Sequence, residues 1–155
     1  MLESTKKLAK EIMKTDVVKV WESDTVQEVA KLILEHDISG FPVVDKQGHV
    51  VGVVTELDLM RNRIAPNEPS IWSTIFGDAD RMRKYQDARR KYMAKTAGEV
   101  MTAPALTVDV SDSLEKVANI MFNKKIKRIF VTEDGKLAGV ISRSVFTRLL
   151  LEMQE

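Results

Sequence analysis

The sequence contains no cysteine, which excludes disulfide bonds and thiolate metal sites. Its two histidines, His36 and His49, are too few for a histidine-rich metal site within one chain. No apolar run approaches the roughly 18–20 residues of a membrane span. The opening stretch MLESTKKLAKEIMK mixes charged and apolar residues, unlike a signal peptide. We therefore expect a cytoplasmic protein without a metal site or membrane contact.

Net charge is also nearly absent. The 24 basic and 23 acidic residues leave a formal charge of +1, which gives no bulk attraction to nucleic acid. What remains is a globular composition, with 44% hydrophobic and 30% charged residues in a chain of 155.

An internal repeat organises the chain. EIMKTDVVKVWESDTVQEVAKLI matches EVMTAPALTVDVSDSLEKVANIM, so that Met13 aligns with Met101 and Asp24 with Asp112. After a one-residue contraction in a turn, Gly52 aligns with Gly139. Residues 9–61 and 97–148 are therefore two copies of one unit.

Each copy predicts the order β-α-β-β-α. In the first copy a short strand at Val17–Trp21 precedes a helix, and Phe41–Val44 and Val50–Val54 form a hairpin. The corresponding strands of the second copy are Leu106–Val110, Ile129–Thr132 and Leu137–Ile141. Asp24 and Asp112 lie where the helix N-caps are expected. A second helix follows each hairpin, starting at Thr55 or Ser142.

Between the copies lies a long insert. We divide the chain into residues 1–61, 62–95 and 96–155, and the middle part predicts two helices. The first helix has apolar residues on one face, namely Ile71, Trp72, Ile75 and Phe76. The second helix is surrounded by basic residues, namely Arg81, Arg83, Lys84, Arg89, Arg90, Lys91 and Lys95. Three interpretations stay open: amphipathic helices with the apolar side on the body and the basic side in water, a partner or dimer surface, and an anion or nucleic-acid patch.

A repeated phrase differs at one acidic position. GVVTELDL at Gly52–Leu59 aligns with GVISRSVF at Gly139–Phe146, so that Asp58 in the first copy aligns with Val145 in the second. The T-x-x-D spacing is itself a capping box, in which Thr55 and Asp58 satisfy the helix start. Because the second copy begins its helix without an acid, Asp58 is available for a ligand.

These features resemble a tandem pair of CBS domains, a Bateman module. The resemblance rests on FPVVDKQGHVVGVVTELDL, on KIKRIFVTEDGKLAGVISRS and on the EIM and EVM segments, about two-thirds of the chain. It implies an α+β fold, mixed α/β, of two β-α-β-β-α repeats packed with pseudo-two-fold symmetry. It also implies a cleft between the repeats for AMP, ADP or ATP, with S-adenosylmethionine as a further candidate.

The resemblance assigns residues to that cleft. Thr55 and Asp58 would contact ribose and phosphate, since a carboxylate accepts hydrogen bonds from both ribose hydroxyls. The expected adenine contacts are Val53, Ala105 and Leu106. The expected phosphate contacts are Lys127 and Arg128. A second, degenerate cleft would contain Val18, Ser142, Arg143 and Val145, where no acid is available for a ribose.

We expect a regulatory, energy-sensing module with no catalytic residues. The chain offers no nucleophile beside a base and no metal cluster. Its effector would be an unknown partner protein or its own homodimer. The alternative is an adaptor that binds nucleic acid or a partner protein through the basic insert, with both clefts empty.

Overall fold

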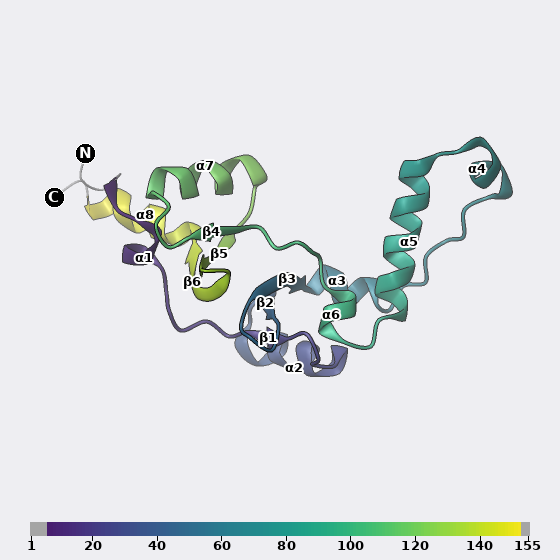
Figure 1. Ribbon diagram of the computed structural model, residues 1–155, viewed down its shortest axis with the longest axis horizontal. Helices are drawn as coiled ribbons and strands as arrows, with labels where there is room; N and C mark the ends of the chain where they lie inside the picture. The colour runs from purple at the N-terminus through teal and green to yellow at the C-terminus, as the bar shows by residue number, and fades with distance from the viewer. Residues whose placement is uncertain (1–5, 153–155) are drawn as a thin grey trace. The chain divides into compact units, whose positions relative to one another are not determined.

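The computed structural model describes residues 6–152 (Figure 1). The chain forms two compact units that are interleaved in sequence. Unit 1 comprises residues 6–18, 46–50 and 105–152, and unit 2 comprises residues 19–45 and 51–104. Each unit is described by itself below.

Unit 2 contains the first strand-rich body and the insert. Its elements are β1 (Val20–Trp21), α2 (Val26–His36), β2 (Gly40–Val44), β3 (Val50–Thr55), α3 (Glu56–Arg61), α4 (Ile71–Phe76), α5 (Ala79–Met93) and α6 (Ala97–Val100). The sheet has the order β1-β2-β3, with β1 parallel to β2. Buried Val20, Val29, Phe41, Val43 and Val54 lie on these strands and on α2.

Unit 1 repeats this arrangement. Its elements are α1 (Ala9–Ile12), β4 (Thr107–Asp109), α7 (Leu114–Lys124), β5 (Arg128–Glu133), β6 (Lys136–Ser142) and α8 (Arg143–Glu152). β4 is parallel to β5, and β5 is antiparallel to β6. Its core includes Ala9, Val117, Met121, Ile129 and Ile141. The predicted α+β fold of two β-α-β-β-α repeats is confirmed.

The short opening helix of each repeat packs in the unit that holds the body of the other repeat. In unit 2, Val53 of β3 and Thr102 exchange backbone hydrogen bonds of 3.0 and 2.9 Å. In unit 1, Lys14 and Val140 of β6 do the same, both at 2.9 Å. The residue that follows each repeated methionine therefore pairs with the strand that precedes the helix start.

The helix caps differ from the sequence expectation by one residue. Thr25 and Ser113, not Asp24 and Asp112, accept hydrogen bonds from the first-turn amides of α2 and α7. The two aspartates turn the other way: Asp24 accepts from the Trp21 amide at 2.9 Å and Asp112 from the Asp109 amide at 2.8 Å. The cap lies one position later than expected because Thr25 and Ser113 each provide a hydroxyl acceptor there. The two aspartates stabilise the turn that precedes each helix.

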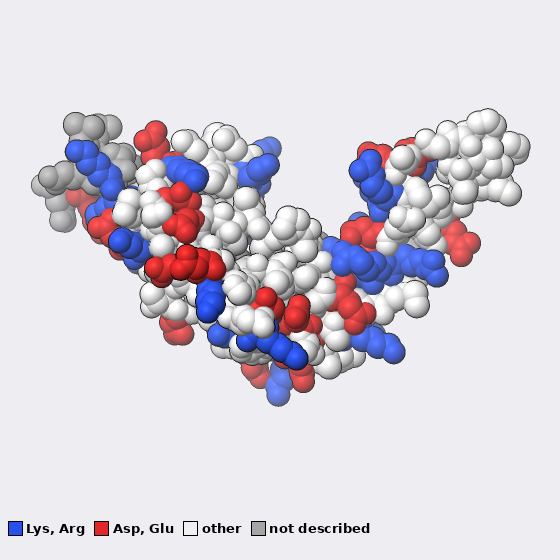
Figure 2. Space-filling view, in the orientation of Figure 1, with Lys and Arg blue, Asp and Glu red and all other residues white. Residues whose placement is uncertain are grey.

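The insert forms the two predicted helices, but the apolar face of the first helix is not buried as the amphipathic interpretation requires. The apolar side chains of α4 are exposed: Ile71 by 70%, Trp72 by 66%, Ile75 by 62% and Phe76 by 77%. Figure 1 shows α4 at the end of α5 that is remote from α3 and α6, and Figure 2 shows few charges there. The expectation that this apolar side packs on the body is wrong, because α4 lies beyond the reach of the unit 2 core.

Within residues 6–152, no helix is both long enough and apolar enough to cross a membrane.

Candidate functional site

The end of β3 places Thr55 and Asp58 at the start of α3. Thr55 is the N-cap, and its hydroxyl accepts from the Asp58 amide at 3.4 Å. The Asp58 Oδ2 atom accepts from the Thr55 amide at 2.8 Å and from the Thr55 hydroxyl at 3.2 Å. The capping-box interpretation of the T-x-x-D spacing is confirmed.

The other oxygen of Asp58 faces the insert and the opening segment of the second repeat. Its Oδ1 atom accepts from Lys91 Nζ at 2.5 Å and from Thr102 Oγ1 at 3.0 Å. Lys91 Nζ also donates to Thr102 Oγ1 at 2.9 Å. Asp58 is only 4% exposed and Lys91 8% exposed. Two contacts at each oxygen fill the carboxylate's usual acceptor capacity.

The backbone around Lys91 and Thr102 is held by other parts of unit 2. Asn62, at the C-terminal cap of α3, donates through Nδ2 to the carbonyls of Lys91 and Ala94, both at 2.8 Å. Thr102 is fixed by its backbone pairing with Val53. The end of α5 is therefore tied to α3 at two levels: its backbone to Asn62 and its lysine to Asp58.

Sequence reasoning missed both partners of Asp58. It placed Lys91 on the basic, solvated side of the insert, and the structure corrects this because α5 ends against α3. Thr102 had a weak signal, since it follows the EVM segment that aligns with EIM. No periodic pattern indicated that Lys91 alone among the α5 cations is buried.

The buried ion pair makes this site electrostatically neutral. Removal of one partner from a buried pair typically costs about 3–5 kcal/mol, because the remaining charge is desolvated without compensation. Lys91 and Asp58 therefore depend on each other, and each needs a replacement partner if they separate.

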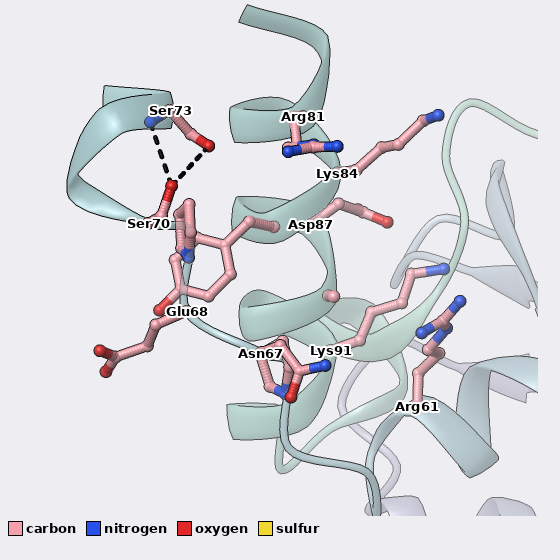
Figure 3. Close-up of a pocket in the computed structure, with 13 residues that line it drawn as sticks. Arg61, Asn67, Glu68, Ser70, Ser73, Arg81, Lys84, Asp87 and Lys91 are labelled. Atoms are coloured by element: carbon pink, nitrogen blue, oxygen red, sulfur yellow. Dashed lines mark hydrogen bonds between the residues drawn. The ribbon is translucent and has the colours of Figure 1, made fainter. Parts of the chain in front are cut away.

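Lys91 also lines a pocket of about 680 Å³ that is formed by residues of α3, α4, α5 and the segment between α3 and α4 (Figure 3). Its charged lining residues are Arg61, Glu68, Arg81, Lys84, Asp87 and Lys91. Asp87 is already bonded to Arg90 at 2.7 Å. Within the described chain, Arg61 and Lys84 form no ion pair. The pocket therefore has an excess of positive charge.

The remaining predicted residues of this site fall in both units. Val53 lies in unit 2, paired with Thr102 as described above. Ala105, Leu106, Lys127 and Arg128 belong to unit 1. Leu106 is 42% exposed, and the Lys127 carbonyl accepts from the Arg143 amide at 3.1 Å. The roles of these four in ligand binding stay predictions.

The residues assigned to the second cleft, Val18, Ser142, Arg143 and Val145, all lie in unit 1. The Ser142 hydroxyl is hydrogen-bonded to the Ser144 hydroxyl at 2.7 Å. Val145 packs against the unit 1 core. The start of α8 therefore has an apolar contact where the start of α3 has a carboxylate.

The part of the chain from residue 6 to 152 contains no cluster of three or more histidine or acidic side chains placed to hold a metal ion.

Comparison with known proteins agrees with this architecture. The family model described as CBS domain matches residues 9–65 and 97–152. CBS domain-containing protein CBSX1, chloroplastic, of Arabidopsis thaliana is 32% identical over 146 residues, covering 91% of this chain and 62% of the relative. The chain therefore spans about three-fifths of that curated relative's length.

Two solved structures are similar over nearly the whole chain. The crystal structure of CBSX2 in complex with AMP has a TM-score of 0.77 and 28% identity, covering 96% of this chain and 99% of that one. The CBS domain of a CBS domain-containing membrane protein from Sphaerobacter thermophilus has a TM-score of 0.65 and 33% identity, covering 94% and 89%.

Proposed function

This chain belongs to the CBS-domain family, and from that premise we propose that it is a regulatory module that binds an adenosine nucleotide at Thr55 and Asp58. The observation that carries the proposal is the buried carboxylate of Asp58 at the strand-to-helix junction. The AMP complex of CBSX2, a protein of the same architecture, supports the choice of ligand class.

The chemistry of Asp58 suits a ribose. Adjacent 2′- and 3′-hydroxyls donate to one carboxylate, and hydrogen bonds to an ionised acceptor are stronger than neutral ones. The capping contacts at Oδ2 hold the carboxylate in place, so its Oδ1 side is the one that a ligand would use. Val145 offers no such acceptor in the second repeat, so we propose one competent site per chain.

Other parts of the ligand would meet residues of the second repeat. We assign the adenine to Val53, Ala105 and Leu106, and a phosphate to Lys127 and Arg128. The ligand would be AMP, ADP or ATP, with S-adenosylmethionine as the further candidate. Binding would regulate a partner protein or a homodimer of this chain, by an amount set by the ligand's differential affinity for two states.

The second candidate function is an adaptor that uses the insert. Cations gather along α5 and near α3 in Figure 2. Among the residues that the structure describes, Arg61 and Lys84 form no ion pair. A nucleic-acid adaptor would bind RNA or DNA with affinity that falls steeply as salt rises. Neutralising Arg89 and Arg90 would then weaken that binding and leave AMP binding intact.

The proposed ribose contact is tested with Asp58→Asn, which keeps the side-chain shape and removes the charge. Calorimetric titration with AMP should show an affinity lower by about 10- to 100-fold, or about 1.5–3 kcal/mol for a hydrogen bond to a charged group. Discrimination between AMP and its 2′,3′-dideoxy analogue should fall as well, because that analogue lacks both donors.

The control is Glu56→Gln, which removes an exposed acid from the same helical turn. It should bind AMP as the parent does. A folded D58N variant that retains both the affinity and the discrimination would rule out Asp58 as the ribose acceptor.

A further inference from the structure

Lys91 is the one member of the Asp58 network that comes from the insert helix α5. We propose that Lys91 is a phosphate-binding residue that changes partner on ligand binding, from Asp58 in the empty site to the phosphate of a bound nucleotide. The inference rests on the proposed function and adds Lys91 to the phosphate contacts proposed there, Lys127 and Arg128: the module selects phosphorylated adenosine compounds over nucleosides.

The first step is the acceptor count at Asp58. Its carboxylate already accepts four hydrogen bonds, two at each oxygen. The Oδ2 contacts come from Thr55, three residues away on the same turn, and they persist as long as α3 is capped. A ribose hydroxyl therefore has to replace a donor at Oδ1, where Lys91 and Thr102 bind.

The second step concerns the displaced cation. The Lys91 side chain is only 10% exposed, so its ammonium group cannot lose Asp58 and remain unpaired without a large desolvation penalty. A nucleoside brings hydroxyls for Asp58 but no anion for Lys91. A nucleotide brings both, and the exchange conserves the number of ionic contacts.

The third step is the space around Lys91. The basic pocket of about 680 Å³ is lined by Lys91 together with Arg61 and Lys84, its two cations that form no ion pair within residues 6–152. Figure 3 shows the side chains of Lys84, Lys91 and Arg61 extending toward the same side of α5. A lysine ammonium on a flexible four-carbon stem can turn toward a phosphate there while the α5 backbone stays bonded to Asn62.

The exchange narrows the ligand class. AMP, ADP and ATP supply the anion that Lys91 needs next to the ribose. Adenosine supplies none, and S-adenosylmethionine carries a sulfonium cation where a nucleotide carries its first phosphate. The insert, which the family pattern does not include, would thereby set the specificity of the site.

The test compares AMP with adenosine by calorimetry in the parent, in Lys91→Met and in Arg89→Met. The parent should prefer AMP by about tenfold or more, as expected for loss of a charge-assisted contact. Lys91→Met should have a smaller preference, with weaker AMP binding and unchanged or tighter adenosine binding, because Lys127 and Arg128 would remain as phosphate contacts. Arg89→Met, which removes an exposed cation from the same helix, should keep the parent's ratio.

Lys91→Met leaves the buried Asp58 carboxylate without its cation and could therefore fail to fold. A second pair of variants, in which Asp58 is also neutralised, avoids this unpaired charge. Asp58→Asn alone should retain a preference for AMP, and the double variant D58N/K91M, which removes both charges, should have a smaller preference than D58N. An unchanged ratio in either Lys91 variant overturns the inference and assigns Lys91 a structural role. A parent that binds neither compound contradicts the proposed function itself.

Discussion

Asp58 has two structural roles, of which the sequence predicted only the first. Its Oδ2 atom completes the cap of α3, and its Oδ1 atom is bonded to side chains from two other segments. The T-x-x-D spacing predicted the first role, because capping is a contact within one turn. The second depends on Lys91, which lies 33 residues away in the chain, and no spacing rule reaches that far.

Gly52 and Gly139, the aligned glycines of the two repeats, allow close packing because they lack a side chain. A Cβ atom on Gly52 would meet the Sδ atom of Met101 and lie 2.9 Å from the Thr102 carbonyl. On Gly139 it would lie 2.7 Å from both the Lys14 carbonyl and Met13 Sδ. The two glycines and the two methionines of the repeat are thus contact pairs, each within one unit.

Gly52→Ala should therefore lower the free energy of unfolding by about 1–3 kcal/mol, the usual cost of overpacking. Urea denaturation followed by circular dichroism measures this change. Gly139→Ala, the matched variant in the other unit, should behave alike. A Gly52→Ala protein as stable as the parent would show that Met101 and Thr102 can move away from β3.

At the scale of elements, the helix starts show how local chemistry places a boundary. Asp112 does not cap α7; it accepts from Lys116 Nζ at 2.8 Å and from the Asp109 amide at 2.8 Å. These two contacts, the lysine first, hold the pKa of Asp112 below its ordinary value of 3.8. The carboxylate therefore ties the turn before α7 to the first turn of the helix.

The lowered pKa has a definite pH signature. Because the folded state binds the proton less tightly than the unfolded state, the contribution of Asp112 to stability is full above pH 3.8 and is lost as the pH falls below it. Asp112→Asn should be less stable than the parent at neutral pH, and the difference should vanish in acid. Denaturation curves across pH 2–7 measure it, with Glu115→Gln as the control. A difference independent of pH would contradict the assignment.

Helix α4 shows where pattern analysis misleads at this scale. The spacing of Ile71, Trp72, Ile75 and Phe76 predicted one apolar face, and the structure has that face. The rings of Trp72 and Phe76 are stacked on it, with their centroids 5.8 Å apart. Periodicity reports that apolar side chains share a face and says nothing about what covers it. The position of α4 at the far end of α5 leaves these side chains exposed.

At the scale of the whole molecule, both repeats leave a large apolar side chain exposed at the same position of their first long helix. Leu34 of α2 is 85% exposed and Phe122 of α7 is 82% exposed. An apolar groove lies beside each of them, between α2 and α3 and between α7 and α8. The resemblance to tandem CBS pairs is the reason that we expect a homodimer, and this repeated surface is the interface that we propose for it.

Sedimentation equilibrium tests this expectation. The parent should have twice the mass of one chain, and the double variant L34E/F122E should be a monomer, because buried glutamates without partners oppose association. The double variant K31E/N119E adds glutamate at exposed, polar positions of the same two helices and should remain a dimer. A monomeric parent, or a dimeric L34E/F122E variant, would contradict the expected interface.

The sequence by itself determined the two repeats, their β-α-β-β-α order, the hairpins and the cap at Thr55, because each follows from burial patterns or contacts within a few residues. Only the tertiary structure decided that Lys91 leaves the solvated face of the insert to neutralise Asp58, that α1 and α6 pack in the opposite bodies, and that α4 stays uncovered. Those outcomes depend on which distant segments contact one another, and local patterns of hydrophobicity and charge do not predict such contacts.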